Sequence, residues 1–125
     1  MINTVDHLII AVQDLNEAEQ DYKKLFGIEP VWRGEHKELG TENVIFNFKN
    51  TYLELLSAKG EGLGAMLVNN TIQENGDGLI GVVFGVENIK EASKSLISKG
   101  FAITEVSDGE GSNNISKELR KWKNF

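Results

Sequence analysis

The alternation of apolar and polar residues divides the first half of the chain into four strands and one helix. Residues 5–12, VDHLIIAV, form an apolar run typical of a buried strand. Apolar residues then recur at helical spacing after Asp14, which can cap the helix, until Gly27 ends it. Three further strands are predicted at residues 28–33, 43–48 and 51–57. The predicted order is therefore β-α-β-β-β.

The second half of the chain repeats this pattern of strand, cap and helix. At an offset of 74 residues the matched pairs are Val12 with Val86, Asp14 with Asn88, Leu15 with Ile89, Ala18 with Ala92, and Tyr22 with Leu96. Because strand, cap and helical stripe match in one register, internal duplication explains the pattern better than two unrelated amphipathic helices. We expect one domain over residues 1–125, with a first module at 1–57, a linker with a short helix at 58–78, and a second module at 79–125.

Composition narrows the possible classes of function. The chain has 125 residues, enough for a single domain with a real core, and it has no cysteine. Disulfides, thiolate metal sites and cysteine nucleophiles are therefore excluded. The formal charge of −6 argues against a nucleic-acid partner, which would need a basic surface. No apolar run is long enough to span a membrane and the first residues lack a secretory pattern, so we expect a cytoplasmic protein.

His7 and Glu54 are the first candidates for chemistry. By strand alternation His7 lies on the opposite face from Leu8, and Glu54 on the opposite face from Leu53 and Leu55. An imidazole and a carboxylate form a suitable ligand set for Zn, Ni, Fe or Mn as a divalent ion. A hydrogen-bonded core histidine and a carboxylate on the wet face of an edge strand also explain these residues. Spacing alone does not decide whether the two side chains meet.

Three other residues are candidates for contact with a ligand. His36 lies in a polar connection bounded by glycine, so it is either an exposed loop histidine or a residue at a cavity rim. At the rim it would contact substrate, complete a metal site or carry a proton. Asn43 either makes local hydrogen bonds in the turn GTEN or orients substrate. Trp32 either lines the mouth of a cavity or points outward from its strand.

The motifs of residues 5–57 resemble those of a known family. The tandem β-α-β-β-β modules, with Gly34 and His36 in G-x-H, then GTEN at 40–43 and YLEL at 52–55, resemble the glyoxalase, or vicinal-oxygen-chelate, superfamily and its glyoxalase-like domain subfamily. The resemblance implies an α+β fold in which paired βαβββ modules form a cupped mixed sheet around a divalent metal ion. It implies metal ligands at His7 and Glu54. Among the alternatives given above for the other residues, we expect catalytic roles for His36 and Glu54 and substrate contacts at His36, Asn43 and Trp32.

The second module departs from the family pattern. Full sites take a second histidine and a second glutamate from this module, but the partner of His7 at the offset of 74 is Gly81, and the partner of Glu54 falls beyond Phe125. The module is also one strand short. The chain is therefore clipped, naturally short, or completed by a strand of another copy, unless residues 101–125 close the module with tight strands. An uncovered sheet edge favours a homodimer, with or without strand exchange.

Two functions follow from the resemblance. The first is a metal-dependent lyase, isomerase or dioxygenase acting on a small oxygenated substrate, in which the ion stabilises negative charge on substrate oxygens. The second is a non-catalytic small-molecule-binding module like the antibiotic-sequestering relatives, including those that confer bleomycin resistance, which needs no metal. Gly81 and the missing second glutamate favour the binding module, whereas His7 and Glu54 favour the enzyme.

Overall fold

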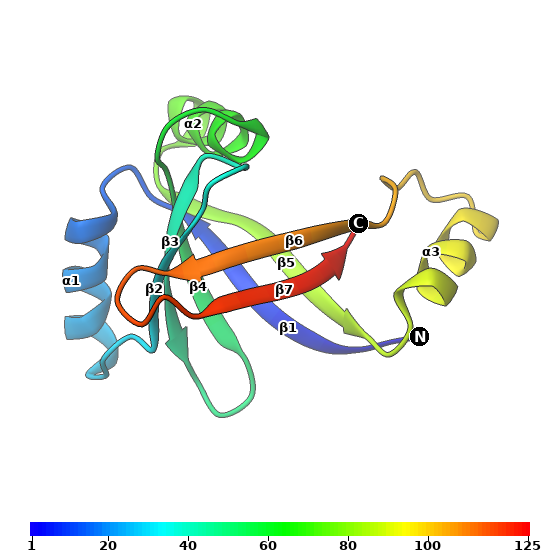
Figure 1. Ribbon diagram of the computed structural model, residues 1–125, viewed down its shortest axis with the longest axis horizontal. Helices are drawn as coiled ribbons and strands as arrows, with labels where there is room; N and C mark the ends of the chain where they lie inside the picture. The colour runs from blue at the N-terminus through cyan, green and yellow to red at the C-terminus, as the bar shows by residue number, and fades with distance from the viewer.

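The computed structural model describes all residues, 1–125, as one curved seven-stranded sheet with three helices (Figure 1). In chain order the elements are β1 (Ile2–Ala11), α1 (Leu15–Phe26), β2 (Trp32–His36), β3 (Thr41–Asn47), β4 (Tyr52–Ala58), α2 (Leu63–Asn75), β5 (Gly78–Val86), α3 (Ile89–Ser98), β6 (Ser107–Asn113) and β7 (Leu119–Asn124). The β-α-β-β-β order of the first module and the α+β fold class are confirmed.

The sheet keeps the first module together and divides the second. Its strand order is β5-β1-β4-β3-β2-β6-β7. The pairing of β1 with β4 is parallel, and all other neighbouring strands are antiparallel. The strands of the second module therefore lie at opposite edges, with β5 beside β1 and the β6–β7 hairpin beside β2. One expectation was that residues 101–125 form tight strands that close the second module. These residues do form two strands, β6 and β7, but the strands extend the sheet of the first module and do not pair with β5.

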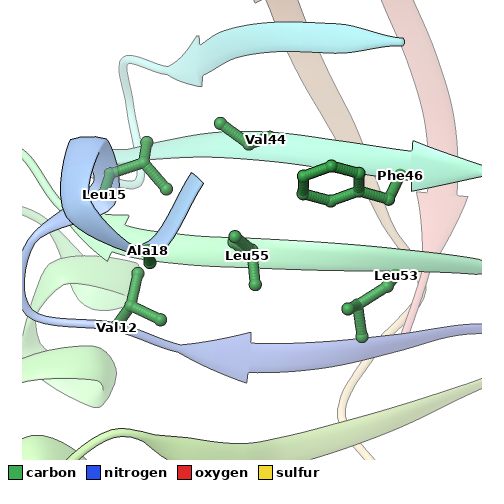
Figure 2. Packing of buried hydrophobic residues seen from close by; sticks show 7 residues of the cluster. All are labelled: Val12, Leu15, Ala18, Val44, Phe46, Leu53 and Leu55. Carbon is green, nitrogen blue, oxygen red and sulfur yellow. The ribbon is translucent and has the colours of Figure 1, made fainter. Parts of the chain in front are cut away.

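The hydrophobic core lies between α1 and one face of the sheet. Figure 2 shows its side chains, which come from the residue after β1, from α1 and from alternate positions of β3 and β4: Val12, Leu15, Ala18, Val44, Phe46, Leu53 and Leu55. Full burial of one such large side chain stabilises the fold by about 1.5–3 kcal/mol. Because strand residues alternate between faces, this packing turns Glu54 toward the opposite, concave face of the sheet.

The helix caps agree with the sequence pattern in both halves. The Asp14 side chain accepts a hydrogen bond from the Glu17 amide at 3.0 Å, and the Asn88 side chain accepts one from the Glu91 amide at 3.1 Å. Gly27 ends α1 in the left-handed conformation, with φ of 68°. The matched caps support internal duplication of strand, cap and helix. The two helices differ in their surroundings, because α1 covers the core whereas α3 lies at the far end of the molecule and has few contacts with other elements (Figure 1).

The predicted position of β2 was wrong, and this changes the environment of His36. Residues 28–33 were expected to form the strand, but it spans Trp32–His36, since Pro30 has no backbone N–H and pairing with β3 begins at Val31. His36 is thus the last residue of a strand and is buried, not part of an exposed loop. The turn that follows ends at Gly40, whose φ of 70° favours glycine. None of the helices is long and apolar enough to cross a bilayer.

Candidate functional site

The structure brings His7 and Glu54 together on the concave face. In the parallel pairing of β1 and β4, His7 lies opposite Tyr52 and stacks on its ring with a centroid separation of 4.3 Å. The His7 ring then reaches along the sheet to Glu54, with 3.3 Å between Nε2 and Oε1. Its other nitrogen, Nδ1, lies 2.8 Å from the Asp6 carboxylate. Because a carboxylate only accepts hydrogen bonds, Nδ1 carries the hydrogen and Nε2 faces Glu54.

The contact between His7 and Glu54 requires a positive charge between two acceptors. With hydrogen on Nδ1, a neutral His7 presents a lone pair at Nε2 to the lone pairs of Oε1. A proton on Nε2 or a divalent cation would relieve this repulsion. Burial lowers the pKa of His7, but its hydrogen bonds with Glu54 and Asp6 outweigh burial, and the pKa is raised. The two carboxylates therefore favour the protonated form of the His7 ring.

Glu54 is held by a chain of buried hydrogen bonds. The Asn43 amide donates to Oε2 of Glu54 at 2.6 Å, and its carbonyl oxygen accepts from Nε1 of Trp32 at 3.2 Å. Burial raises the pKa of Glu54, but the hydrogen bonds from His7 and Asn43 outweigh it, and the pKa is lowered. Glu54 is thus a carboxylate at neutral pH. One expectation was that Asn43 makes local hydrogen bonds in a turn. This was wrong, because Asn43 lies within β3 and pairs with β4.

His36 approaches the other oxygen of Glu54. It pairs with Thr41 across β2 and β3, and its Nδ1 lies 2.8 Å from the threonine hydroxyl. Its Nε2 is 4.0 Å from Oε2 of Glu54, too far for a direct hydrogen bond. Burial lowers the pKa of His36 despite the charge of Glu54, so the imidazole is neutral at neutral pH. The ring is therefore oriented by Thr41 with one nitrogen directed toward the carboxylate.

Two side chains of the β6–β7 hairpin contact His36 and Trp32, and sequence reasoning missed the part of the hairpin in the site. The Trp122 indole meets the His36 ring edge-on, with centroids 5.6 Å apart, and the Arg120 guanidinium lies 4.4 Å from the centre of the Trp32 ring. Gly109 leaves the space that Trp122 fills, because an added Cβ would overlap its indole. From the sequence, the basic residues near the C-terminal end of the chain were interpreted as a solvent-exposed surface. The alternation of Arg120 and Trp122 on one strand was the available signal.

All five predicted site residues, His7, Trp32, His36, Asn43 and Glu54, thus lie on one face in a connected set. The donor set suits a divalent ion at one point, where Nε2 of His7 and Oε1 of Glu54 converge and Asp6 orients the imidazole from behind. No group of three or more histidine or acidic side chains is arranged to hold a metal ion. Two protein ligands are therefore available, and their roles toward a metal remain predictions.

Two shallow depressions elsewhere on the surface contain none of these residues. One lies at the C-terminal end of α1, and the other lies between α2 and the ends of β1 and β4. Neither has a carboxylate–imidazole contact. The concave face is therefore the better candidate for chemistry.

A curved mixed sheet with a βαβββ module, and with histidine and glutamate facing each other from its first and fourth strands, is the architecture of the vicinal-oxygen-chelate superfamily. A family model described as the glyoxalase-like domain matches residues 5–124. The chain belongs to this family, and the recognition made from the sequence motifs is confirmed.

Known proteins similar to this chain include several epimerases. A mitochondrial methylmalonyl-CoA epimerase of Dictyostelium discoideum is 31% identical over 108 residues, which cover 83% of this chain and 61% of that protein. The chain thus spans about three fifths of the length of this curated relative. Streptomyces coelicolor methylmalonyl-CoA epimerase in complex with 2-nitronate-propionyl-CoA has a TM-score of 0.72 at 18% identity, over 88% of this chain and 87% of that one.

A hypothetical protein from Bacillus halodurans has a TM-score of 0.74 at 16% identity, over 96% of this chain and 92% of that chain. At these identities the solved structures show a shared fold only.

Proposed function

We propose that this protein is an isomerase of the glyoxalase-like family that moves a proton at a carbon atom beside a carbonyl group. The observation that carries the proposal is the buried Glu54 carboxylate with an imidazole directed at each of its oxygens, 3.3 Å away for His7 and 4.0 Å away for His36. The name of the Dictyostelium relative supports an epimerase, which is an isomerase of this kind.

His7 and Glu54 would hold the divalent ion that the superfamily typically uses. Nε2 of His7 and Oε1 of Glu54 are the two converging donors, and substrate oxygens and water would complete the ligand set. When bound, such an ion supplies Lewis-acid stabilisation of negative charge on a substrate oxygen. Asp6 and Asn43 orient the two ligands through their own hydrogen bonds.

His36 is the group that we assign to proton transfer. Burial lowers the pKa of His36, so its imidazole is unprotonated at neutral pH and available to accept a proton. The hydrogen bond with Thr41 fixes the orientation of the ring. A proton leaves the substrate carbon for Nε2, and the electron pair moves onto the adjacent carbonyl oxygen. Water then delivers a proton to the opposite face of the same carbon as the carbonyl re-forms, which gives the isomer, and His36 releases its proton to solvent. The 4.0 Å between Nε2 and Glu54 is too long for a hydrogen bond, so Nε2 is not held by the carboxylate.

The test is exchange of hydrogen at that carbon. The protein is incubated with methylmalonyl-CoA in D₂O with Co²⁺ present, and uptake of one deuterium is followed by mass spectrometry. We expect exchange by the wild type and at least about a hundredfold slower exchange by His36→Gln, in line with loss of a general base. No exchange by the wild type with any divalent ion would refute the proposal for this substrate.

A second candidate is a binding protein without catalysis. It is favoured by the finding that no group of three or more histidine or acidic side chains is arranged to hold a metal ion. It is also favoured by Gly81, which lies opposite Ile9 on β1 and provides no donor from β5. This candidate predicts a ligand that binds equally well with EDTA, and no deuterium uptake.

We also propose that two copies associate through β5. This strand pairs only with β1, so its other edge is free, and its exposed side chains include Leu79, Val82 and Phe84. Light scattering after size exclusion should show a dimer of the wild type and a shift toward monomer for Val82→Lys. A monomeric wild type at high concentration would contradict the association.

A further inference from the structure

The β6–β7 hairpin leaves little space at the reactive edge of His36. The His36 and Glu54 residues are only 9% and 8% exposed. Gly111 of β6 lies against the imidazole, because a Cβ built on this glycine would be 3.2 Å from Cδ2 and 3.5 Å from Nε2 of His36. Trp122 of β7 meets the same ring edge-on, with centroids 5.6 Å apart. A single added carbon atom already crowds this edge, so a substrate has no room beside Nε2 while the hairpin is in place.

The hairpin is joined firmly within itself and loosely to the rest of the sheet. Six residue pairs connect β6 with β7, but only two connect β6 with β2. One more backbone hydrogen bond runs from the Asn114 amide to the Arg33 carbonyl oxygen, at 2.9 Å. The other side of β2, by comparison, makes five pairs with β3. A unit with so few ties to its neighbour opens at a lower free-energy cost than the central strands do.

The remaining surroundings of the hairpin also allow it to move. β7 is the last strand of the sheet, and all six of its residues are exposed. Residues 101–106, which lead into β6, belong to no helix or strand. The preceding helix, α3, has few contacts with other elements and lies at the far end of the molecule (Figure 1). The hairpin can therefore lift without disturbing the core between α1 and the sheet.

We propose that the β6–β7 hairpin is a lid, which lifts from β2 to admit a ligand to His36 and Glu54 and then closes over it. The role of the ligand rests on the function proposed above, whereas the opening itself is measured without turnover. Lifting leaves in place the residues that hold Glu54, since His7 lies on β1 and Asn43 on β3. Closure then shields the reacting carbon from bulk water.

A disulfide across the seam between β2 and β6 tests the lid. Glu35 and Ser112 lie opposite each other in this antiparallel pairing, where Cα atoms are about 4.5–5.5 Å apart, within the range that a disulfide spans. Glu35 alternates with Gly34 and His36, so the bond forms on the outer face and leaves the inner face unchanged. The chain has no cysteine, so Glu35→Cys/Ser112→Cys forms one defined bond. The reduced form of the same protein shows the effect of the two substitutions alone.

The readout is the rate at which diethyl pyrocarbonate modifies His36, followed by mass spectrometry of its peptide. We expect the oxidised form to react at least about tenfold more slowly than the reduced form, because the bond prevents the opening that exposes Nε2. The matched control is Asp108→Cys/Lys123→Cys, which joins β6 to β7 within the hairpin and leaves the hairpin free to lift. Its oxidised and reduced forms should react at rates within about twofold of each other.

The wild type provides a second test, which needs no substitution. Urea well below the unfolding midpoint should speed the modification of His36. The slope of this effect should be less than about a third of the slope for global unfolding, because lifting the hairpin exposes only a small part of the surface that unfolding exposes.

Three results would each overturn the lid. They are equal rates for oxidised and reduced Glu35→Cys/Ser112→Cys, an equal loss on oxidation of the control, and a urea slope as steep as that of global unfolding. The isomerase proposal fails separately, in the deuterium-exchange assay. Protection of His36 by the disulfide, in a protein that exchanges no deuterium, would support the lid and refute only the catalysis.

Discussion

Replacing Asn43 by alanine tests whether the hydrogen-bond chain holds Glu54 as a carboxylate. The change removes the 2.6 Å bond to Oε2 of Glu54 and leaves the buried N–H of Trp32 without its acceptor. A hydrogen bond to a charged group contributes about 1.5–3 kcal/mol, and an unsatisfied buried donor costs about 1–3 kcal/mol. We therefore expect Asn43→Ala to lower the free energy of unfolding by about 3–5 kcal/mol.

A double-mutant cycle separates the charged part of this loss. In Glu54→Gln the acceptor is neutral, so its bond to Asn43 is weaker and the alanine change costs less. We expect the two changes together to destabilise by about 1–2 kcal/mol less than the sum of the single changes. Urea unfolding followed by circular dichroism gives all four free energies.

The control cycle pairs Asn43→Ala with Lys94→Ala, an exposed position on α3 far from the site. Distant changes should add within about 0.5 kcal/mol. If the cycle with Glu54→Gln is equally additive, Asn43 does not stabilise the charge of Glu54, and the account of the site given above is wrong.

Three further predictions concern the metal, the packing of the hairpin and its mobility. Wild-type protein dialysed against Co²⁺ should retain about one ion per chain, and His7→Ala or Glu54→Ala should lose it, as measured by plasma mass spectrometry. Gly109→Ala should lower Tm by about 3–10 °C because the new Cβ overlaps the Trp122 indole, whereas Gly78→Ala, with open space around it, should lower Tm by about 3 °C at most. Amides of β6 and β7 should exchange hydrogen faster than those of β3 and β4, because only two residue pairs join β6 to β2.

The sequence alone predicted those features that depend on residues close together in the chain. The caps at Asp14 and Asn88 and the facing of Glu54 away from Leu53 and Leu55 follow from periodicity over a few residues. The place of His36 did not follow, because the inner face of β2 carries tryptophan, glycine and histidine and so lacks an apolar alternation.

The other missed features depend on residues far apart in the chain. Asn43 reads as a turn residue until β4 brings Glu54 against it. Arg120 and Trp122 read as part of a basic tail, because their partners, Trp32 and His36, precede them by more than eighty residues. Such contacts depend on which sheet edge the hairpin joins, and periodicity does not specify an edge.

The pairing of the β6–β7 hairpin with β2 helps to explain why Glu54 is buried although the second module supplies no histidine or glutamate ligand. In a module that repeats the first completely, a fourth strand would join β5 to the rest of the second half. Here β6 pairs with the edge of β2 instead, and two side chains of β7 lie against its inner face, Trp122 on His36 and Arg120 on Trp32. Burying Glu54 at 8% exposure is costly unless its charge is compensated. His7 and Asn43 compensate the charge, and Trp122 and Arg120 of the hairpin cover their neighbours His36 and Trp32. Removing that cover should therefore weaken every electrostatic contact in the site, even though no ligand residue is changed.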